Sequence, residues 1–291
     1  MNRAICVLAN NMYLFKELII NLPDNLKDFK FFVFNDTRIG DKTEEIHKIM
    51  SDSELNYEII TDKDTNELLP VKTDFVYDYS MSLKMLMPWY LFSTKNVDKV
   101  LFSDEDVLYT ERLLNVFNSI NTCSFARLRL QAVSDRNMSP GPGRSYTSLI
   151  HICECVGYNY DPEEWYQKRI NAGQFIIKKE FFNLKHYQES LIKFFENEYL
   201  FDTWKSRRVH TSFFIDERFL AAFVIQSGIY NNDLEKHVLL CINNETKIED
   251  KFLINNYNKK SILHICNNSH KKKTYDRMIK LGLIKGELPE I

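Results

Sequence analysis

The stretch Lys99-Val-Leu-Phe-Ser-Asp-Glu-Asp-Val-Leu-Tyr109 runs from an apolar segment directly into three consecutive acidic residues. Burying an unpaired carboxylate is costly, so acids at the tip of an apolar strand need a partner or contact with water. The triplet could be a solvated turn, or it could supply the N-cap of a following helix. A third interpretation is that it holds a divalent cation. The rest of the chain is needed to choose among the three.

Asp104 and Asp106 are the two members of the triplet best placed to bind one ion. Because they lie two residues apart, an extended backbone directs both side chains to one side, while Glu105 points to the other. Carboxylate oxygens are hard ligands, which suit Mg²⁺ or Mn²⁺ together with the phosphates of a substrate. An Asp-x-Asp pair by itself is a weak signal, because such triplets often arise by chance.

Short apolar runs alternate with amphipathic stretches on both sides of this segment. This alternation predicts an α/β fold with a mostly parallel twisted sheet and helices on both faces. We expect strands at 4–9, 29–34, 57–60 and 100–103, helices at 12–22, 43–52, 80–92 and 111–120, and an irregular acidic segment at 61–78. The polar residues that follow the strands would then share one edge of the sheet, where ligands bind in such folds.

The composition of the chain gives no overall reason to expect a nucleic acid or a membrane as partner. Its 291 residues are 44% hydrophobic, enough for a large core, and the formal net charge is -2. From Lys251 to Ile291, however, nine Lys and Arg residues accompany three Asp and Glu residues. This basic C-terminal segment could meet phosphate groups or be an ordinary charged tail. Because we find neither a membrane-spanning apolar run nor a signal peptide, we expect a cytoplasmic protein.

Three later segments carry residues that could act together with the acidic triplet. Asn171-Ala-Gly173 predicts a small-residue turn before an apolar strand, where a ligand can approach the backbone closely. Asp216 and Glu217 open an apolar helix, although helix capping alone would explain Asp216. His264 belongs to a short apolar strand. A buried core histidine is the default interpretation there, and a role as metal ligand requires further ligands nearby.

The order of these segments resembles the glycosyltransferase family 8 type of GT-A enzyme, to which glycogenin and the lipopolysaccharide galactosyltransferases belong. Asn10-Asn-Met-Tyr13 is similar to the family's uridine-binding turn, and Ser82-Leu-Lys-Met-Leu-Met-Pro-Trp89 resembles the helix whose basic residue faces the donor. The Lys99–Tyr109 stretch resembles the strand that ends in the metal-binding Asp-x-Asp motif. Asn171-Ala-Gly173 is similar to the turn that touches the donor sugar. The resemblance covers nearly the whole chain.

The resemblance implies a role for each matching residue. Asp104, Asp106 and His264 would bind Mn²⁺ or Mg²⁺, and Asp216, Glu217 and Asn171 would lie beside the reacting sugar carbon. The residues implied to bind the nucleotide-sugar donor are Leu8, Ala9, Asn10, Tyr13, Asp36, Lys84, Ala172, Gly173, Lys271 and Lys272. Tyr13 would stack on the uracil ring, and Asp36 would accept from the base or ribose unless it only forms a turn. One of the two C-terminal lysines would hold the diphosphate.

The implied activity is the transfer of a sugar from a UDP-sugar to a hydroxyl of a glycan or a lipid-linked glycan. The reaction would depend on the metal and would retain the configuration at the anomeric carbon. The implied organisation is a single GT-A domain over residues 1–291. It would have a nucleotide-binding half at 1–123, an acceptor and donor-sugar half at 124–250, and a basic C-terminal segment at 251–291 that closes the donor site.

The sequence departs from the family's pattern in three places. The family's late motif continues from the histidine through Gly to Lys-Pro-Trp, whereas His264 is followed by Ile-Cys-Asn-Asn-Ser-His-Lys-Lys. The lysine that would hold the diphosphate is therefore open between Lys271 and Lys272. Glu217 replaces the usual Gln and adds a charge near the reaction centre. Residues 125–170 match nothing in the family, and this region normally chooses the acceptor.

Three rival functions stay open at this point. A phage-type glycosyltransferase would act on a hydroxymethylated DNA base, held by aromatic residues and by arginines on the phosphate backbone. The candidates for these contacts are Trp165, Tyr166, Arg127, Arg129, Arg136 and Arg144. A sugar-nucleotide nucleotidyltransferase would carry a Gly-rich basic loop after the first strand, where this chain has Leu-Ala-Asn-Asn-Met-Tyr-Leu-Phe. A non-catalytic binding module would not need the intact Asp-x-Asp motif or His264.

Overall fold

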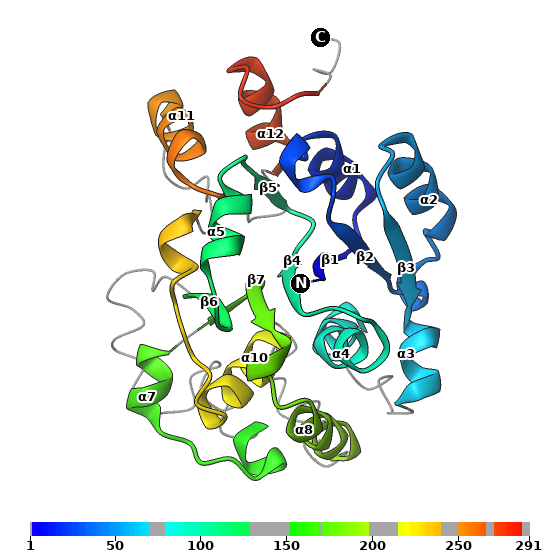
Figure 1. Ribbon diagram of the computed structural model, residues 1–291, viewed down its shortest axis with the longest axis vertical. Coiled ribbons are helices and arrows are strands. Elements are labelled where there is room, and N and C mark those ends of the chain that lie inside the picture. The colour runs from blue at the N-terminus through cyan, green and yellow to red at the C-terminus, as the bar shows by residue number, and fades with distance from the viewer. Residues whose placement is uncertain are drawn as a thin grey trace.

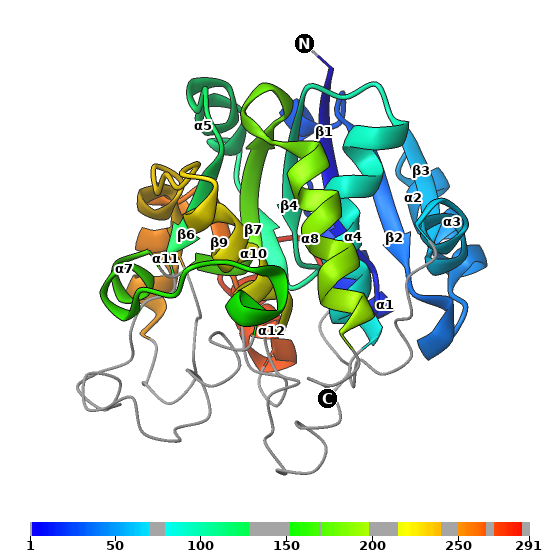
Figure 2. The same cartoon turned by 90° about the horizontal axis from the view of Figure 1, so that it is seen from below.

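A twisted sheet forms the centre of the protein (Figures 1 and 2). The computed structural model describes residues 2–69, 79–127, 152–168, 170–197, 215–239, 249–265 and 271–286. Within them, six strands pair in the order β3-β2-β1-β4-β7-β6. Their bounds are β1 (Arg3–Leu8), β2 (Lys30–Asn35), β3 (Tyr57–Thr61), β4 (Lys99–Ser103), β6 (Ser124–Arg127) and β7 (Ile170–Lys178).

The first four strands of the chain run parallel, whereas β7 runs antiparallel to both β4 and β6. Each of these four strands begins and ends within one residue of its predicted position. They are continuous apolar runs because both faces of the sheet are covered. In β1, for example, Cys6 belongs to the core on one side and Val7 to the core on the other. The predicted α/β class with a mostly parallel sheet is confirmed.

Two layers of helices cover the sheet. The layer on one face contains α4 (Tyr79–Thr94), α8 (Leu184–Glu196) and α10 (Ile215–Gln226), with α4 and α8 side by side in Figure 2. The layer on the other face contains α1 (Met12–Ile20), α2 (Thr43–Asp52) and α5 (Leu113–Ser119). Within the described ranges, no helix combines the length and apolar character that crossing a bilayer requires.

The acidic segment that we expected to be irregular contains the helix α3 (Asp62–Leu68), so that expectation was wrong. The helix begins with a capping box. The Asp64 backbone N–H donates to Oγ1 of Thr61 (3.4 Å), and the Thr61 backbone N–H donates to the Asp64 carboxylate (2.7 Å). The acids at this point therefore satisfy free N–H groups at a helix N-terminus. The predicted helix around Pro88 does form, as α4.

A second, three-stranded sheet brings the C-terminal part of the chain to the end of β4. It contains β5 (Val107–Tyr109), β9 (Ile262–His264) and β8 (Val238–Leu239), in the order β5-β9-β8. Among the described residues, further helices are α7 (Pro162–Gln167), α11 (Asp250–Lys259) and α12 (Lys271–Lys280), and the 3-10 helices include η1 (Asp24–Leu26), η2 (Thr37–Ile39), η3 (Lys179–Phe181) and η4 (Glu235–His237). In Figure 1, α12 lies beside α1.

Candidate functional site

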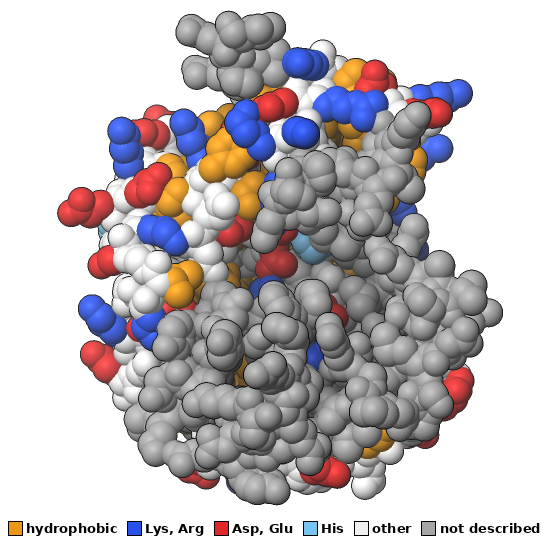
Figure 3. Space-filling view, turned by 180° about the vertical axis from the view of Figure 1, so that it is seen from behind, with side chains coloured by type: hydrophobic (Ala, Val, Ile, Leu, Met, Phe, Trp, Pro, Cys, Tyr) orange, Lys and Arg blue, Asp and Glu red, His pale blue; other side chains and the backbone are white. Residues whose placement is uncertain are grey.

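The acidic triplet forms the turn that connects β4 to β5. Asp106 is 8% exposed, while Asp104 is partly exposed. The backbone N–H of Asp104 donates to the carbonyl of Gly173 at 2.8 Å, which ties the turn to β7. This turn lies at the carboxyl end of β4, the edge at which parallel sheets bind ligands. On the face seen in Figure 3, acidic side chains lie beside a histidine near the middle.

Strand pairing carries His264 to the two aspartates. β9 runs antiparallel to β5 with His264 opposite Val107, and the Ile265 backbone N–H donates to the carbonyl of Asp106 at 2.8 Å. The Nε2 atom of His264 lies 3.1 Å from Oδ1 of Asp106 and 3.9 Å from Oδ2 of Asp104. One ligand atom from each of the three residues lies within 4.8 Å of the others. The three predicted metal ligands therefore come together from distant parts of the chain.

The donor set of this cluster fits a hard divalent cation. Two carboxylates and one imidazole offer oxygen-rich coordination with positions left for phosphate oxygens, as Mg²⁺ and Mn²⁺ sites do. Gly173 leaves the space that the cluster occupies. A Cβ atom on Gly173 would lie 2.6 Å from Oδ2 of Asp104 and 2.9 Å from Cε1 of His264. A side chain at this position would therefore displace the metal ligands.

Two lysines from different helices contact the aspartates. Nζ of Lys84, in α4, lies 2.5 Å from Oδ1 of Asp104, and Nζ of Lys271, the first residue of α12, lies 2.7 Å from Oδ2 of Asp106. Lys272 instead pairs with Asp276 at 3.0 Å on its own helix. Of the two lysines left open by the sequence, Lys271 is therefore the one at the cluster.

The charges of the cluster move the pKa values of its acids apart. Burial raises the pKa of Asp104 above its usual range, and the charge of Asp106 adds to that rise while Lys84 opposes it. Burial also acts on Asp106, but the charges of His264 and Lys271 outweigh it and hold the pKa of Asp106 well below its usual range. At neutral pH, Asp106 is therefore the carboxylate most firmly held in its ionised form.

The segment Asn171-Ala-Gly173 lies inside β7, so the turn expected before that strand was wrong. Phe125 pairs with Phe175 and Ala126 with Asn171, which leaves Ala172 to Gln174 as a bulge in β7. Bulges turn backbone and side chains toward sites at the edges of sheets. Here Oδ1 of Asn171 accepts from the Gly173 backbone N–H at 2.9 Å. The bulge holds the small residues against the metal ligands.

Glu217, one of the predicted sugar-side residues, contacts this bulge. Oε2 of Glu217 lies 3.4 Å from the backbone N of Ala172 and accepts its hydrogen bond. Glu217 and Asn171 are both buried. The side chain of Asp216 lies outside the described residues. The proposed roles of these residues beside a sugar carbon stay predictions.

The turn after β1 is held from two sides. Leu8 and Ala9 are buried at the end of the strand. The carboxylate of Glu105 accepts from the backbone N–H groups of Asn10 (2.5 Å) and Asn11 (2.9 Å), while the Lys42 ammonium donates to the carbonyl of Asn10. Burial raises the pKa of Glu105 to about 7, against the lowering effect of the two N–H donors. The sequence indicated that Glu105 points away from the metal ligands, but gave no sign of this contact.

Tyr13 and Asp36 have different surroundings. Tyr13 is 38% exposed, and its ring packs edge-on against Tyr275 of α12, with 6.2 Å between the ring centroids. Stacking of this ring on a base stays a prediction. The Asp36 side chain is fully buried, and its two carboxylate oxygens each accept from the Arg38 guanidinium at 2.8 Å. A contact between Asp36 and a donor stays a prediction.

The residues singled out for a DNA acceptor fall outside what the structure describes. This holds for all of Arg129, Arg136 and Arg144, and for the side chains of Arg127, Trp165 and Tyr166. The division of the chain into two halves and a closing C-terminal segment also stays a prediction.

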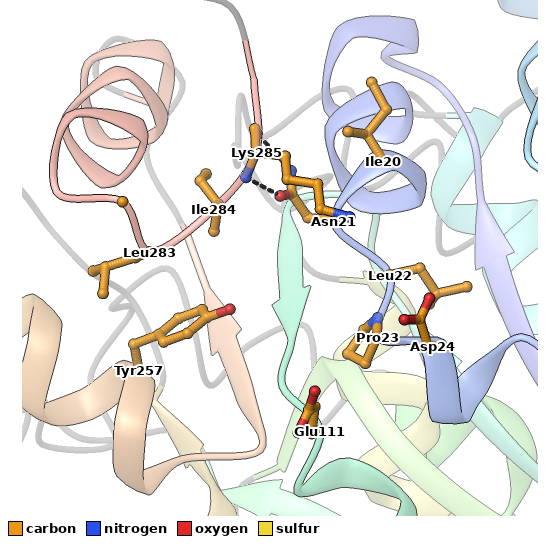
Figure 4. A pocket seen from close by; sticks show the side chains of 11 residues that line it. Ile20, Asn21, Leu22, Pro23, Asp24, Glu111, Tyr257, Leu283, Ile284 and Lys285 are labelled. Carbon is orange, nitrogen blue, oxygen red and sulfur yellow. Dashed lines mark hydrogen bonds between the residues drawn. The ribbon is translucent and has the colours of Figure 1, made fainter.

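A pocket of about 320 Å³ lies at the other end of α1, between the segment that follows α1, α11 and residues 282–285 (Figure 4). The Lys285 backbone N–H donates to Oδ1 of Asn21 at 2.6 Å, and Nδ2 of Asn21 donates to the Lys285 carbonyl at 3.1 Å. None of the predicted site residues lines this pocket. We assign the functional site to the acidic cluster, because charged groups from four separate elements converge there.

The comparisons with known proteins support the fold. No protein-family model matches the sequence, and a search of curated proteins gave no match either. The structure of the galactosyltransferase LgtC in complex with donor and acceptor sugar analogues is similar over 98% of this chain and 97% of its own, with a TM-score of 0.52 and 14% identity. An active-site mutant of LgtC gives a TM-score of 0.51 at the same identity and coverage.

The glycosyltransferase GlyE of Streptococcus pneumoniae is similar over all of this chain and 66% of its own, at 12% identity. Its TM-score of 0.48 is too low to add to the argument. At these identities the LgtC structures establish a shared fold. They confirm the GT-A-like architecture that the sequence resemblance implied.

Proposed function

We propose that the protein is a metal-dependent glycosyltransferase that moves a sugar from a UDP-sugar to an acceptor hydroxyl with retention at the anomeric carbon. The observation that carries this proposal is the convergence of Asp104, Asp106 and His264 at the carboxyl edge of the sheet, flanked by two lysines. The fold is that of the galactosyltransferase LgtC, which was solved with donor and acceptor sugar analogues.

Departure of the nucleoside diphosphate is the step that the site is suited to assist. Asp104, Asp106 and His264 would hold a divalent ion, which when bound would neutralise charge on the leaving diphosphate oxygens. Lys84 and Lys271 already lie within 2.7 Å of the aspartate oxygens, so a short side-chain movement would bring each ammonium group to a phosphate. Cations fixed where negative charge develops stabilise the transition state.

The bulge in β7 is the candidate sugar site. Gly173 gives the metal ligands the space that a side chain would fill, and Glu217 fixes the bulge by accepting from the Ala172 backbone N–H. The reacting carbon gains positive charge as its bond to the diphosphate breaks, and nearby carboxylates such as Asp216 and Glu217 would stabilise that charge. Asn171 would position a sugar hydroxyl.

The turn after β1 is the candidate uridine site. Tyr13 would stack on the base, a contact worth about 1–3 kcal/mol by analogy with aromatic stacking on bases. Leu8, Ala9 and Asn10 would contact the nucleoside through their backbone and side-chain polar groups. We propose a glycan or a lipid-linked glycan as acceptor, on the strength of the resemblance alone.

The test is a screen of UDP-sugars for release of UDP. The purified protein is incubated with each donor in Mn²⁺, in Mg²⁺ and in EDTA, first without acceptor and then with glycan, lipid-linked glycan or hydroxymethylated DNA. We expect UDP to be released from at least one donor. This release should require the metal, and it should become faster when one class of acceptor is added. The anomeric configuration of the product, read by NMR, tests retention. Absence of metal-dependent release from every donor would contradict the proposal.

A further inference from the structure

Glu105 joins the metal-binding turn to the turn after β1. It lies between the two aspartates, but its carboxylate faces away from them and accepts from the backbone N–H groups of Asn10 and Asn11 at 2.5 and 2.9 Å. One carboxylate therefore grips two successive amides directly before α1, where the helix dipole also favours a negative charge. The metal-binding turn and the turn after β1 are fixed to each other through this side chain.

Lys42 makes a second contact with the turn after β1. The ammonium of Lys42, which precedes α2, donates to the carbonyl of Asn10. Asn10 is thus held on its N–H side by the carboxyl group of Glu105 and on its carbonyl side by the ammonium of Lys42. The preceding residue, Ala9, donates its backbone N–H to the carbonyl of Phe34 at 2.8 Å. The turns after β1, β2 and β4 form one unit at the carboxyl edge of the sheet.

Rigid spacing between these turns has a functional use where one ligand contacts both. On the proposed function, a nucleoside diphosphate does so, with its base at the turn after β1 and its diphosphate at Asp104 and Asp106. We propose that Glu105 is a positioning residue that sets the distance between the nucleoside-binding turn and the metal-binding turn. The inference rests on the proposed function for its ligand, but the contact itself can be tested without any ligand.

Two substitutions separate position from charge. Glu105→Asp keeps the negative charge but shortens the side chain by one methylene group, so the carboxylate no longer reaches both amides. Glu105→Gln keeps the length and one acceptor, but removes the charge and turns an NH₂ group toward the second amide. If Glu105 acts by position, Asp is the more damaging substitution. If it acts only by its charge near the metal ligands, Gln is the more damaging substitution.

The first measurement is UDP binding in the presence of Mn²⁺ by calorimetry. We expect the UDP dissociation constant to rise about 2–5-fold for Glu105→Gln and about 10-fold or more for Glu105→Asp and Glu105→Ala. Mn²⁺ binding without nucleotide should stay within about twofold of wild type for Glu105→Asp. With an active donor, the KM for the donor should rise while kcat stays unchanged. This is the pattern expected when a substitution weakens the binding of substrate and transition state equally. The reverse order of Asp and Gln, or no change in any variant, would overturn the inference.

The second measurement is amide hydrogen exchange at Asn10 and Asn11, read by NMR without ligand. Both amides should exchange slowly in the wild-type protein and fast in Glu105→Asp and Glu105→Ala. The control is Glu58→Gln. Glu58 lies on β3 and is ion-paired with Lys30 and Lys95, so its replacement should leave these amides and UDP binding unchanged. Fast exchange in the wild-type protein would refute the contact. Slow exchange without UDP binding would refute the proposed function instead.

Discussion

Gly173→Ala is the substitution that probes the geometry of the site most sharply. The added Cβ would lie 2.6 Å from Oδ2 of Asp104, 2.7 Å from Oδ1 of Asn171 and 2.9 Å from Cε1 of His264. Ordinary van der Waals contact begins at about 3.4 Å. The Asp104 carboxylate would therefore have to move by roughly 0.8 Å to relieve the overlap.

Such a movement exceeds what a metal site tolerates. Ligand distances in metal sites hold to within about 0.2 Å, and disturbances next to the ligands typically reduce metal affinity 10- to 100-fold. We expect the Mn²⁺ dissociation constant of Gly173→Ala to rise by that factor, which corresponds to about 1.4–2.7 kcal/mol. The backbone of Gly173 does not need the left-handed region, so the substitution adds no backbone strain.

The assay is a titration with Mn²⁺ followed by the EPR signal of the free ion. Gly157→Ala is the control, because Gly157 has a φ of +77° and its added Cβ would meet nothing within 4 Å. That variant should lose about 1–2 kcal/mol of stability and keep the Mn²⁺ affinity of the wild type. A Gly173→Ala protein that binds Mn²⁺ as tightly as the wild type would refute the geometry on which the site rests.

Three further predictions follow from individual side chains. Lys271→Ala should reduce kcat/KM for the donor about 10-fold or more while its neighbour variant Lys272→Ala stays near wild type, because Lys271 contacts Asp106 whereas Lys272 pairs with Asp276. Equal effects of the two variants in steady-state kinetics would contradict this. Tyr13→Ala should raise the donor KM roughly 5- to 150-fold, for loss of about 1–3 kcal/mol of stacking, and an unaltered KM would show that the ring does not meet the base. Burial lowers the pKa of Lys99 to about 8, so between that pH and its ordinary value the unfolded chain binds more protons and stability rises with pH. Between pH 7.5 and pH 9.5, the free energy of unfolding of the wild type should therefore rise by about 2 kcal/mol more than that of Lys99→Met, as measured by chemical denaturation. The same change with pH in both proteins would exclude the lowered pKa of Lys99.

The strands and helices that could be predicted from the sequence are those whose pattern is local. The apolar runs of β1 and β4 and the amphipathic pattern of α2 each lie within a dozen residues, so hydrophobic periodicity is sufficient to find them. The helix α3 was missed because its signal is the capping box formed by Thr61 and Asp64. We interpreted the acidic residues of this segment as a sign of irregular structure.

The contacts that complete the site depend on pairings across the chain. His264 reaches Asp106 because β9 pairs with β5, and nothing in either segment specifies that register. The resemblance to a known family supplied the histidine, but not the choice of Lys271 over Lys272, which depends on the direction of each side chain from α12. The hydrogen bonds from Asn10 and Asn11 to Glu105 follow from the meeting of two strand ends and have no sequence signature.

The central claim is that one divalent ion is bound by two aspartates and a histidine at the edge of the sheet. Crystals grown with Mn²⁺ and UDP, measured at a wavelength where manganese scatters anomalously, test it most directly. The account predicts a single strong peak within about 2.5 Å of Oδ atoms of Asp104 and Asp106 and of a ring nitrogen of His264, with diphosphate oxygens completing the coordination. A peak at another place, or ordered UDP with no peak at these residues, would contradict it.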